Sequence, residues 1–211
     1  MIEYLIRHPD KIMEPLIEHI ELVGVTLVIS VLIASVLTVL AMKSEQFYHA
    51  MISVFSVIYS IPSLALFALL IPLTGLGTIS AVIVLTLYNQ YLLIRNFTTG
   101  LMEVDPAVCE AAKGIGMTDM QILYKVRLPL ASKALFAGVR LAVVSTIGIG
   151  TIAAAINAGG LGELLLDGLR TLNINKILWG SILSAGLAIL INGVLKAVEN
   201  RKGKYESNSH I

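Results

Sequence analysis

The stretch that decides the fold runs from residue 46 to residue 94 and reads QFYHAMISVFSVIYSIPSLALFALLIPLTGLGTISAVIVLTLYNQYLLI. Between Glu45 and Arg95, which flank it, there is no Asp, Glu, Lys or Arg. A transmembrane helix needs about 20 predominantly apolar residues, so the stretch has room for two consecutive spans. A buried core segment could explain one such run but not two in succession. The sequence therefore predicts a membrane protein.

The composition of the whole chain agrees with this prediction. Of its 211 residues, 56% are hydrophobic and 14% are charged, whereas a soluble domain carries about 25% charged residues. We expect an all-α integral membrane protein with five transmembrane helices, at residues 22–42, 51–73, 76–94, 135–156 and 177–195. Pro62 lies inside the second span and Pro72 near its end, which predicts one kinked helix that turns tightly into the third.

The first 20 residues have a different pattern, in which apolar residues recur at helical spacing with charged residues between them. This pattern favours an amphipathic helix that lies on the membrane. A disordered tail or a partly buried sixth helix are the alternatives. We expect the transmembrane domain to occupy residues 21–200 and a polar cytoplasmic tail to follow at 201–211.

The distribution of Lys and Arg predicts which loops face the cytoplasm. If the segment 95–134 is inside, ten cations lie on the inner face and four on the outer face. The inner ones are Lys43, Arg95, Lys113, Lys125, Arg127, Lys133, Lys196, Arg201, Lys202 and Lys204, and the outer ones are Arg7, Lys11, Arg170 and Lys176. Arg140 lies just inside the fourth span, where we expect its long side chain to reach water at the inner end rather than to line a pore.

The inner loop 95–134 is predicted to contain a short helix. Asp105 is a good N-cap and Pro106 suits the first helical position, while residues 107–113 favour a helix. Gly114 and Gly116 then end it. A second short helix can start at Asp119 with Thr118 as its cap and end at Pro129. The alternative is a solvated linker with a chance pattern.

The same loop carries a resemblance to a known family. It is similar to the EAA loop of permease subunits in bacterial ATP-binding-cassette (ABC) importers, with Val126 where Ile is usual, and the matching pattern is Glu110-Ala111-Ala112-x3-Gly116-x9-Val126-x-Leu128-Pro129. The resemblance implies that a coupling helix around residues 110–116 docks into a groove of a separate ATPase subunit. Small Ala111 and Ala112 would allow close docking, Glu110 would offer a carboxylate, and Gly116 and Pro129 would shape the turn and the bend.

A longer resemblance, from Glu110 through Leu169, is to permeases that take up osmoprotectants such as glycine betaine, carnitine and choline. Its second characteristic segment spans residues 158–162, although methionine-type importers have something similar. Residues 34–39 depart from the pattern because they lack a Gly/Pro-containing turn. The resemblance implies a MetI-like ABC permease fold in the bacterial cytoplasmic membrane. It also implies ATPase subunits, a second identical or paralogous permease and an extracytoplasmic substrate-binding protein as partners, with membrane lipids around them.

The chain offers no site for its own chemistry. It lacks a Gly-x4-Gly-Lys-Ser/Thr loop, so ATP and Mg²⁺ are expected on the partner ATPase and no cofactor on this chain. The four histidines lack metal-ligand spacing, and no catalytic cluster or nucleic-acid partner is indicated. An ion-gradient transporter, the main rival class, would be expected to have intramembrane acids or inverted repeats, and neither is apparent. Within the ABC class, an amino-acid or methionine permease is the alternative.

Polar neutral residues within the spans are the candidates for a translocation path. We name Tyr59, Asn89, Gln90 and Asn157, of which the adjacent amides of Asn89 and Gln90 are the strongest. The alternative for each is an interhelical hydrogen bond. Trp179 is the only tryptophan, although a quaternary ammonium group is usually held by several aromatic rings. High-affinity selection is therefore expected in another protein.

Overall fold

The computed structural model describes residues 2–208, with side chains placed for residues 3–201. Every element in this part of the chain is helical. In chain order they are α1 Ile2–Arg7, α2 Asp10–Ala41, α3 Glu45–Ser60, α4 Ser63–Thr74, α5 Thr78–Met102, α6 Pro106–Gly114, α7 Asp119–Ile122, the π-helix η1 Leu123–Arg127, α8 Leu128–Leu130, α9 Ser132–Ile152, the 3-10 helix η2 Ala153–Ile156, α10 Leu161–Arg170 and α11 Ile174–Asn208.

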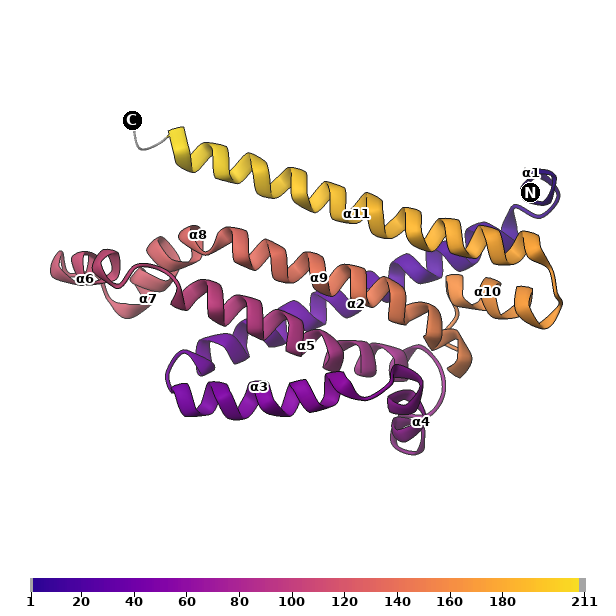
Figure 1. Cartoon of the computed structure of the whole chain (residues 1–211), viewed down its shortest axis with the longest axis horizontal. Coiled ribbons are helices and arrows are strands. Elements are labelled where there is room, and N and C mark those ends of the chain that lie inside the picture. Colours follow the sequence, from indigo (N-terminus) through magenta and orange to yellow (C-terminus); the bar gives the residue numbers. More distant parts are fainter. Residues whose placement is uncertain (1, 209–211) are drawn as a thin grey trace.

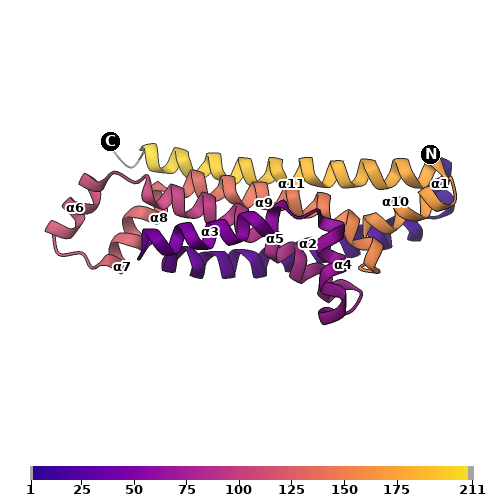
Figure 2. The same cartoon turned by 60° about the horizontal axis from the view of Figure 1, so that its bottom comes forward.

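Helices α2, α5 and α9 pack against one another and form the centre of an elongated bundle (Figure 1). Helices α3 and α4 pack on α5, and α11 packs on α9 and α10. The segment α6–α8 and the C-terminal end of α11 lie at one end of the bundle, while α1 and α10 lie at the other (Figure 2). We call these the inner and outer ends, following the distribution of Lys and Arg.

The predicted all-α class and the number of spans agree with the structure. Among residues 2–208, four helices are long and apolar enough to cross a membrane, and α3 with α4 can make a fifth span. Many large apolar side chains on α2, α3 and α11 remain exposed on the single chain, as expected where lipid or another subunit covers them.

The second span differs from its prediction. Residues 51–73 were expected to form one kinked helix, but α3 and α4 are separate helices bent by 102°. Ile61 has an extended backbone, with φ −69° and ψ 132°, because the ring of Pro62 disfavours helical geometry in the preceding residue. The Tyr88 hydroxyl donates to the Ile61 carbonyl and satisfies this freed backbone group.

The N-terminal segment also differs from its prediction. No separate surface helix covers residues 1–20, because α2 begins at Asp10 and continues without a break into the first span. Ile12, His19 and Leu22 are buried along this part of α2, whereas Met13, Ile17 and Ile20 remain exposed. At the other terminus, residues 201–208 extend α11, and the rest of the expected polar tail lies outside the described residues.

Arg140 forms an ion pair rather than reaching water alone. Its guanidinium lies 2.8 Å from the Glu199 carboxylate, which joins α9 to α11 near the inner end. The exposed fractions of the two side chains are only 24% and 16%. This pair neutralises the one cation placed inside a predicted span.

Gly162 provides a test of the packing at the outer end. A Cβ at this position would overlap the Thr151 carbonyl, whereas a Cβ at Gly148 would meet nothing within 4 Å. We expect Gly162→Ala to lower the free energy of unfolding by about 1–3 kcal/mol through overpacking, and the matched Gly148→Ala to raise it by about 0.5–1 kcal/mol. Unfolding in detergent measures both, and equal effects would contradict the packing described.

Candidate functional site

The predicted coupling loop forms a helix-turn-helix at the inner end of the bundle (Figure 2). The Asp105 carboxylate accepts the Ala107 N–H at 2.8 Å, and Pro106 occupies the first turn of α6. At the C-terminal side of α6, Gly116 has a φ of +86°, a conformation that side chains beyond glycine rarely adopt. Both local predictions, the helix start and the glycine turn, are confirmed.

The second helix begins as predicted but ends differently. Thr118 and Gln121 form a reciprocal capping box, in which each side chain accepts the other residue's backbone N–H. The chain then widens into the π-helix η1, where the Leu128 N–H bonds to the Leu123 carbonyl five residues back. Pro129 therefore does not end the helix, because the wider turn accommodates a residue that has no N–H and continues into α8.

The coupling residues divide between the surface and the interior. Glu110, Ala111 and Gly116 are exposed, but Ala112 is only 7% exposed and packs within its own chain. Ala112 therefore cannot form the contact surface that its size suggested. The exposed apolar side chains nearby are Val108, Ile115 and Met120. Large apolar groups clustered outside the spans are typical of a protein-binding surface.

A hydrophobic cluster connects this surface to the membrane helices. Leu101 at the end of α5, Leu123 in η1 and Ala131 before α9 are buried together. Leu128 and Cys109 pack against them from the coupling segment. This cluster is the packed contact between α6 and the inner ends of α5 and α9, and close-packed side chains can transmit strain.

Asn89 and Gln90 are fully buried inside the bundle, where they join helices. The Asn89 amide donates to Thr146 Oγ1 on α9 at 2.8 Å and to Ser30 Oγ on α2 at 3.2 Å. The Gln90 amide donates to the backbone carbonyls of Ser30 and Thr86. Both residues therefore form interhelical hydrogen bonds, which was the alternative to a place on the translocation path.

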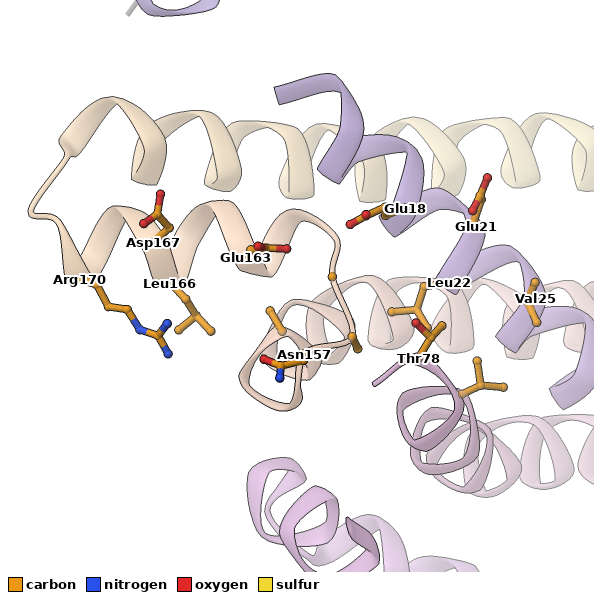
Figure 3. A pocket seen from close by; sticks show the side chains of 14 residues that line it. Glu18, Glu21, Leu22, Val25, Thr78, Asn157, Glu163, Leu166, Asp167 and Arg170 are labelled. Carbon is orange, nitrogen blue, oxygen red and sulfur yellow. The ribbon is translucent and has the colours of Figure 1, made fainter. Parts of the chain in front are cut away.

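Tyr59 and Asn157, the other two path candidates, have different surroundings. The Tyr59 ring is partly exposed and lies against Tyr88 and Tyr91 on α5. Asn157 is exposed at the outer end, with a left-handed φ of 62°. It lines a cavity of about 760 Å³ between α2 and α10. In this cavity Glu18 and Glu163 point toward one another from the two helices, with Asp167 and Arg170 further along α10 (Figure 3).

Glu18 and His19 on α2 contact the turn before α10 and the helix α9 at the outer end. The spacing of residues in the sequence does not reveal these contacts. The Glu18 carboxylate accepts the Gly160 N–H at 2.8 Å, and His19 Nε2 lies 3.2 Å from the Ile147 carbonyl. A Cβ at Gly160 would lie 2.9 Å from His19 Nδ1, and one at Gly150 would lie 3.1 Å from His19 Cε1.

With this geometry established, comparison with known proteins identifies the family. The chain matches the model for the binding-protein-dependent transport system inner membrane component over residues 22–204. The chain belongs to this family. It is therefore a multi-pass membrane protein and a transport component.

Curated relatives of this permease are osmoprotectant transporters. The osmoprotectant import permease protein OsmW of Salmonella typhimurium is 34% identical over 203 residues, which is 94% of each chain. The choline transport system permease protein OpuBB of Bacillus subtilis is 32% identical and covers 95% of this chain and 93% of its own. The glycine betaine/carnitine/choline permease protein OpuCB of the same organism is 33% identical, over 87% and 85%.

Solved structures confirm the fold of the permease. A chain of the inward-facing MetNI methionine ABC transporter aligns with a TM-score of 0.84 at 22% identity, and covers 90% of this chain and 95% of its own. A chain of an amino acid ABC transporter aligns with a TM-score of 0.78 at 18% identity, over 93% and 96%. At these identities the likeness shows the shared architecture alone.

The Asn89 bridge can be measured with a double-mutant cycle. We expect Asn89→Ala and Thr146→Val each to destabilise the permease in detergent, with a coupling free energy of about 0.6–1.7 kcal/mol, the range for hydrogen bonds between membrane helices. Thr151→Val is the matched control, because its hydroxyl bonds to the Gly148 carbonyl of its own helix. Additive effects of Asn89→Ala and Thr146→Val would contradict the bridge.

Proposed function

We propose that this permease forms the translocation path of an ABC importer for a quaternary ammonium osmoprotectant, such as glycine betaine, carnitine or choline. The observation that carries this proposal is identity of 34% and 32% to osmoprotectant and choline permeases over nearly the whole chain. The exposed helix-turn-helix at the inner end, with its own hydrophobic connection to the spans, supports the proposal of an ATP-driven mechanism.

The permease would lie in the bacterial cytoplasmic membrane with α6 and α7 in the cytoplasm. The bias of Lys and Arg toward that end supports this orientation. ATP and Mg²⁺ would bind to the partner ATPase. Its groove would receive Glu110 and Ala111, together with the apolar side chains of Val108 and Ile115. Closure of the ATPases would then move α6 and, through Leu128 and its hydrophobic cluster, the inner ends of α5 and α9.

A second permease, identical or paralogous, would complete the path. The single chain leaves apolar side chains of α3 and α11 exposed, among them Val54, Val57, Ile189 and Leu190. Lipid and the second subunit would cover them. A substrate-binding protein would deliver its cargo to the outer end, where the acid-lined cavity between α2 and α10 opens.

The coupling role predicts a defect in transport without a defect in folding. We expect Glu110→Lys and Gly116→Trp to remain in the membrane but to reduce ATP-driven uptake by tenfold or more, because the first reverses a charge at the docking surface and the second cannot adopt the Gly116 turn. Glu103→Lys, which reverses an exposed charge outside α6, is the matched control. Normal uptake in both variants would refute the docking role.

The substrate class is tested by uptake of labelled compounds. Proteoliposomes would contain the permease with its partner ATPase and substrate-binding protein. We expect ATP-dependent accumulation of at least one of glycine betaine, carnitine and choline, with none in the absence of the ATPase. Accumulation of methionine or another primary amino acid in their place would show that the permease serves an amino-acid importer.

A further inference from the structure

Three tyrosines from two helices form an aromatic cluster in the permease. Tyr59 comes from the end of α3, and Tyr88 and Tyr91 come from α5. The ring centroids of Tyr59 and Tyr88 are 5.7 Å apart in an edge-to-face arrangement, and those of Tyr59 and Tyr91 are 5.0 Å apart. Tyr88 is buried and held by its hydrogen bond to Ile61, whereas Tyr59 and Tyr91 are partly exposed.

The cluster lies beside the middle of α5, close to the inner end of the predicted third span at residues 76–94. Tyr91 is in the middle of α5, about 20 Å along the helix from Thr78 at 1.5 Å per residue. Next to it, the chain breaks between α3 and α4. Backbone that leaves the helix at this depth is tolerated only where protein buries it or where it lines a cavity that admits water. At this break the Tyr88 hydroxyl satisfies the Ile61 carbonyl, and the partly exposed rings of Tyr59 and Tyr91 beside it are open to contact with a solute.

Arg95 lies one helical turn after Tyr91 on α5, toward the inner end, and interacts with the Tyr91 ring. Its guanidinium donates to the Tyr91 hydroxyl at 2.9 Å, and its central carbon lies 5.9 Å from the centre of the Tyr91 ring. This is the distance at which a cation interacts with an aromatic face. None of the ion pairs among residues 3–201 involves Arg95. Its positive charge is thus available to an anion.

A groove of about 480 Å³ runs along α3 and α5 from Tyr91 and Arg95. Its other lining residues are Tyr48, His49, Ile52, Ser53, Ser56 and Val57, and no Asp or Glu is among them. Tyr59 does not line the groove itself but lies beside it, against the Tyr91 ring. A simple cation in this groove would be repelled by Arg95 without a carboxylate to compensate. A zwitterion would place its cation on the tyrosine rings and its carboxylate at Arg95.

We propose that Tyr59, Tyr91 and Arg95 form a low-affinity site for a carboxylate-bearing quaternary ammonium compound on the translocation path. The two partly exposed rings bind the ammonium group, Arg95 binds the carboxylate, and Tyr88 positions the Tyr59 ring. The site selects glycine betaine or carnitine over choline, which has no carboxylate. This inference rests on the proposed function, because it assumes that a quaternary ammonium compound crosses the permease.

The site is tested by equilibrium binding to the permease–ATPase complex in nanodiscs without binding protein. The probes are radiolabelled glycine betaine and choline at millimolar concentration. We expect wild-type complex to bind glycine betaine in preference to choline. Tyr59→Leu and Tyr91→Leu should each raise the Kd for glycine betaine about tenfold. Arg95→Gln should weaken glycine betaine binding to a similar degree and abolish the preference over choline.

Conservative and matched variants separate binding from packing. Tyr91→Phe removes the hydroxyl but keeps the aromatic face, so its Kd should stay within about threefold of wild type. Phe47→Leu replaces an exposed ring on α3 that belongs neither to the groove lining nor to the tyrosine cluster, and it should leave the Kd unchanged. Basal ATPase activity shows that each complex is assembled. If Tyr91→Phe weakens binding as much as Tyr91→Leu, the cation–π role is refuted.

Uptake by the full importer distinguishes failure of the proposed function from failure of the tyrosine–arginine site. If wild-type proteoliposomes take up no quaternary ammonium compound, the proposed function fails. If they take up glycine betaine but the complex without binding protein shows no binding, or the leucine variants bind and transport as wild type does, only the tyrosine–arginine site is overturned.

Discussion

The Asn89 amide joins the three helices on which every other element depends. Its two donors reach Ser30 on α2 and Thr146 on α9 from the middle of α5. In a membrane, lipid tails are as apolar as the helix surfaces, so polar links and close packing set the helix register. Gly138 on α9 contributes such packing, since a Cβ there would lie 2.8 Å from the Asn96 Cβ. Helices α3, α4, α10 and α11 then pack on this central group.

The two ends of the bundle are built for different tasks. At the inner end, capped short helices carry exposed charged and apolar groups, and a buried cluster around Leu123 packs them against the spans. At the outer end, glycines with positive φ let a hairpin approach α2 closely, where Glu18 and His19 hold it. Between them lie the broken second span and the tyrosines. A motion that starts at α6 can reach this middle region through α5, which is one continuous helix from Thr78 to Met102.

Predictions from the sequence succeeded where one residue and its neighbours decide the outcome. Asp105 and Thr118 cap their helices because a short polar side chain can reach an N–H two or three residues on. The predictions from the sequence were wrong where the packing of distant segments decides the structure. Pro62 indicated a disturbed helix but not the 102° bend, and the charges in residues 10–20 did not reveal that α2 continues through them. Pro129 was expected to end a helix, but the π-helix before it accommodates the missing donor.

The sequence by itself determined the membrane class, the number of spans, the short helix α6 with its glycine turn and the resemblance to a family of permeases. These follow from charge, length and local backbone preference, which neighbouring residues carry. Only the tertiary structure decided that Asn89 is a bridge, that Ala112 is turned inward, that Arg140 has Glu199 as its partner and that three tyrosines meet beside Arg95. Glu18 and Gly160 are 142 residues apart in the chain. Their contact depends on how whole helices pack, and no local sequence pattern predicts a contact between residues so far apart in the chain.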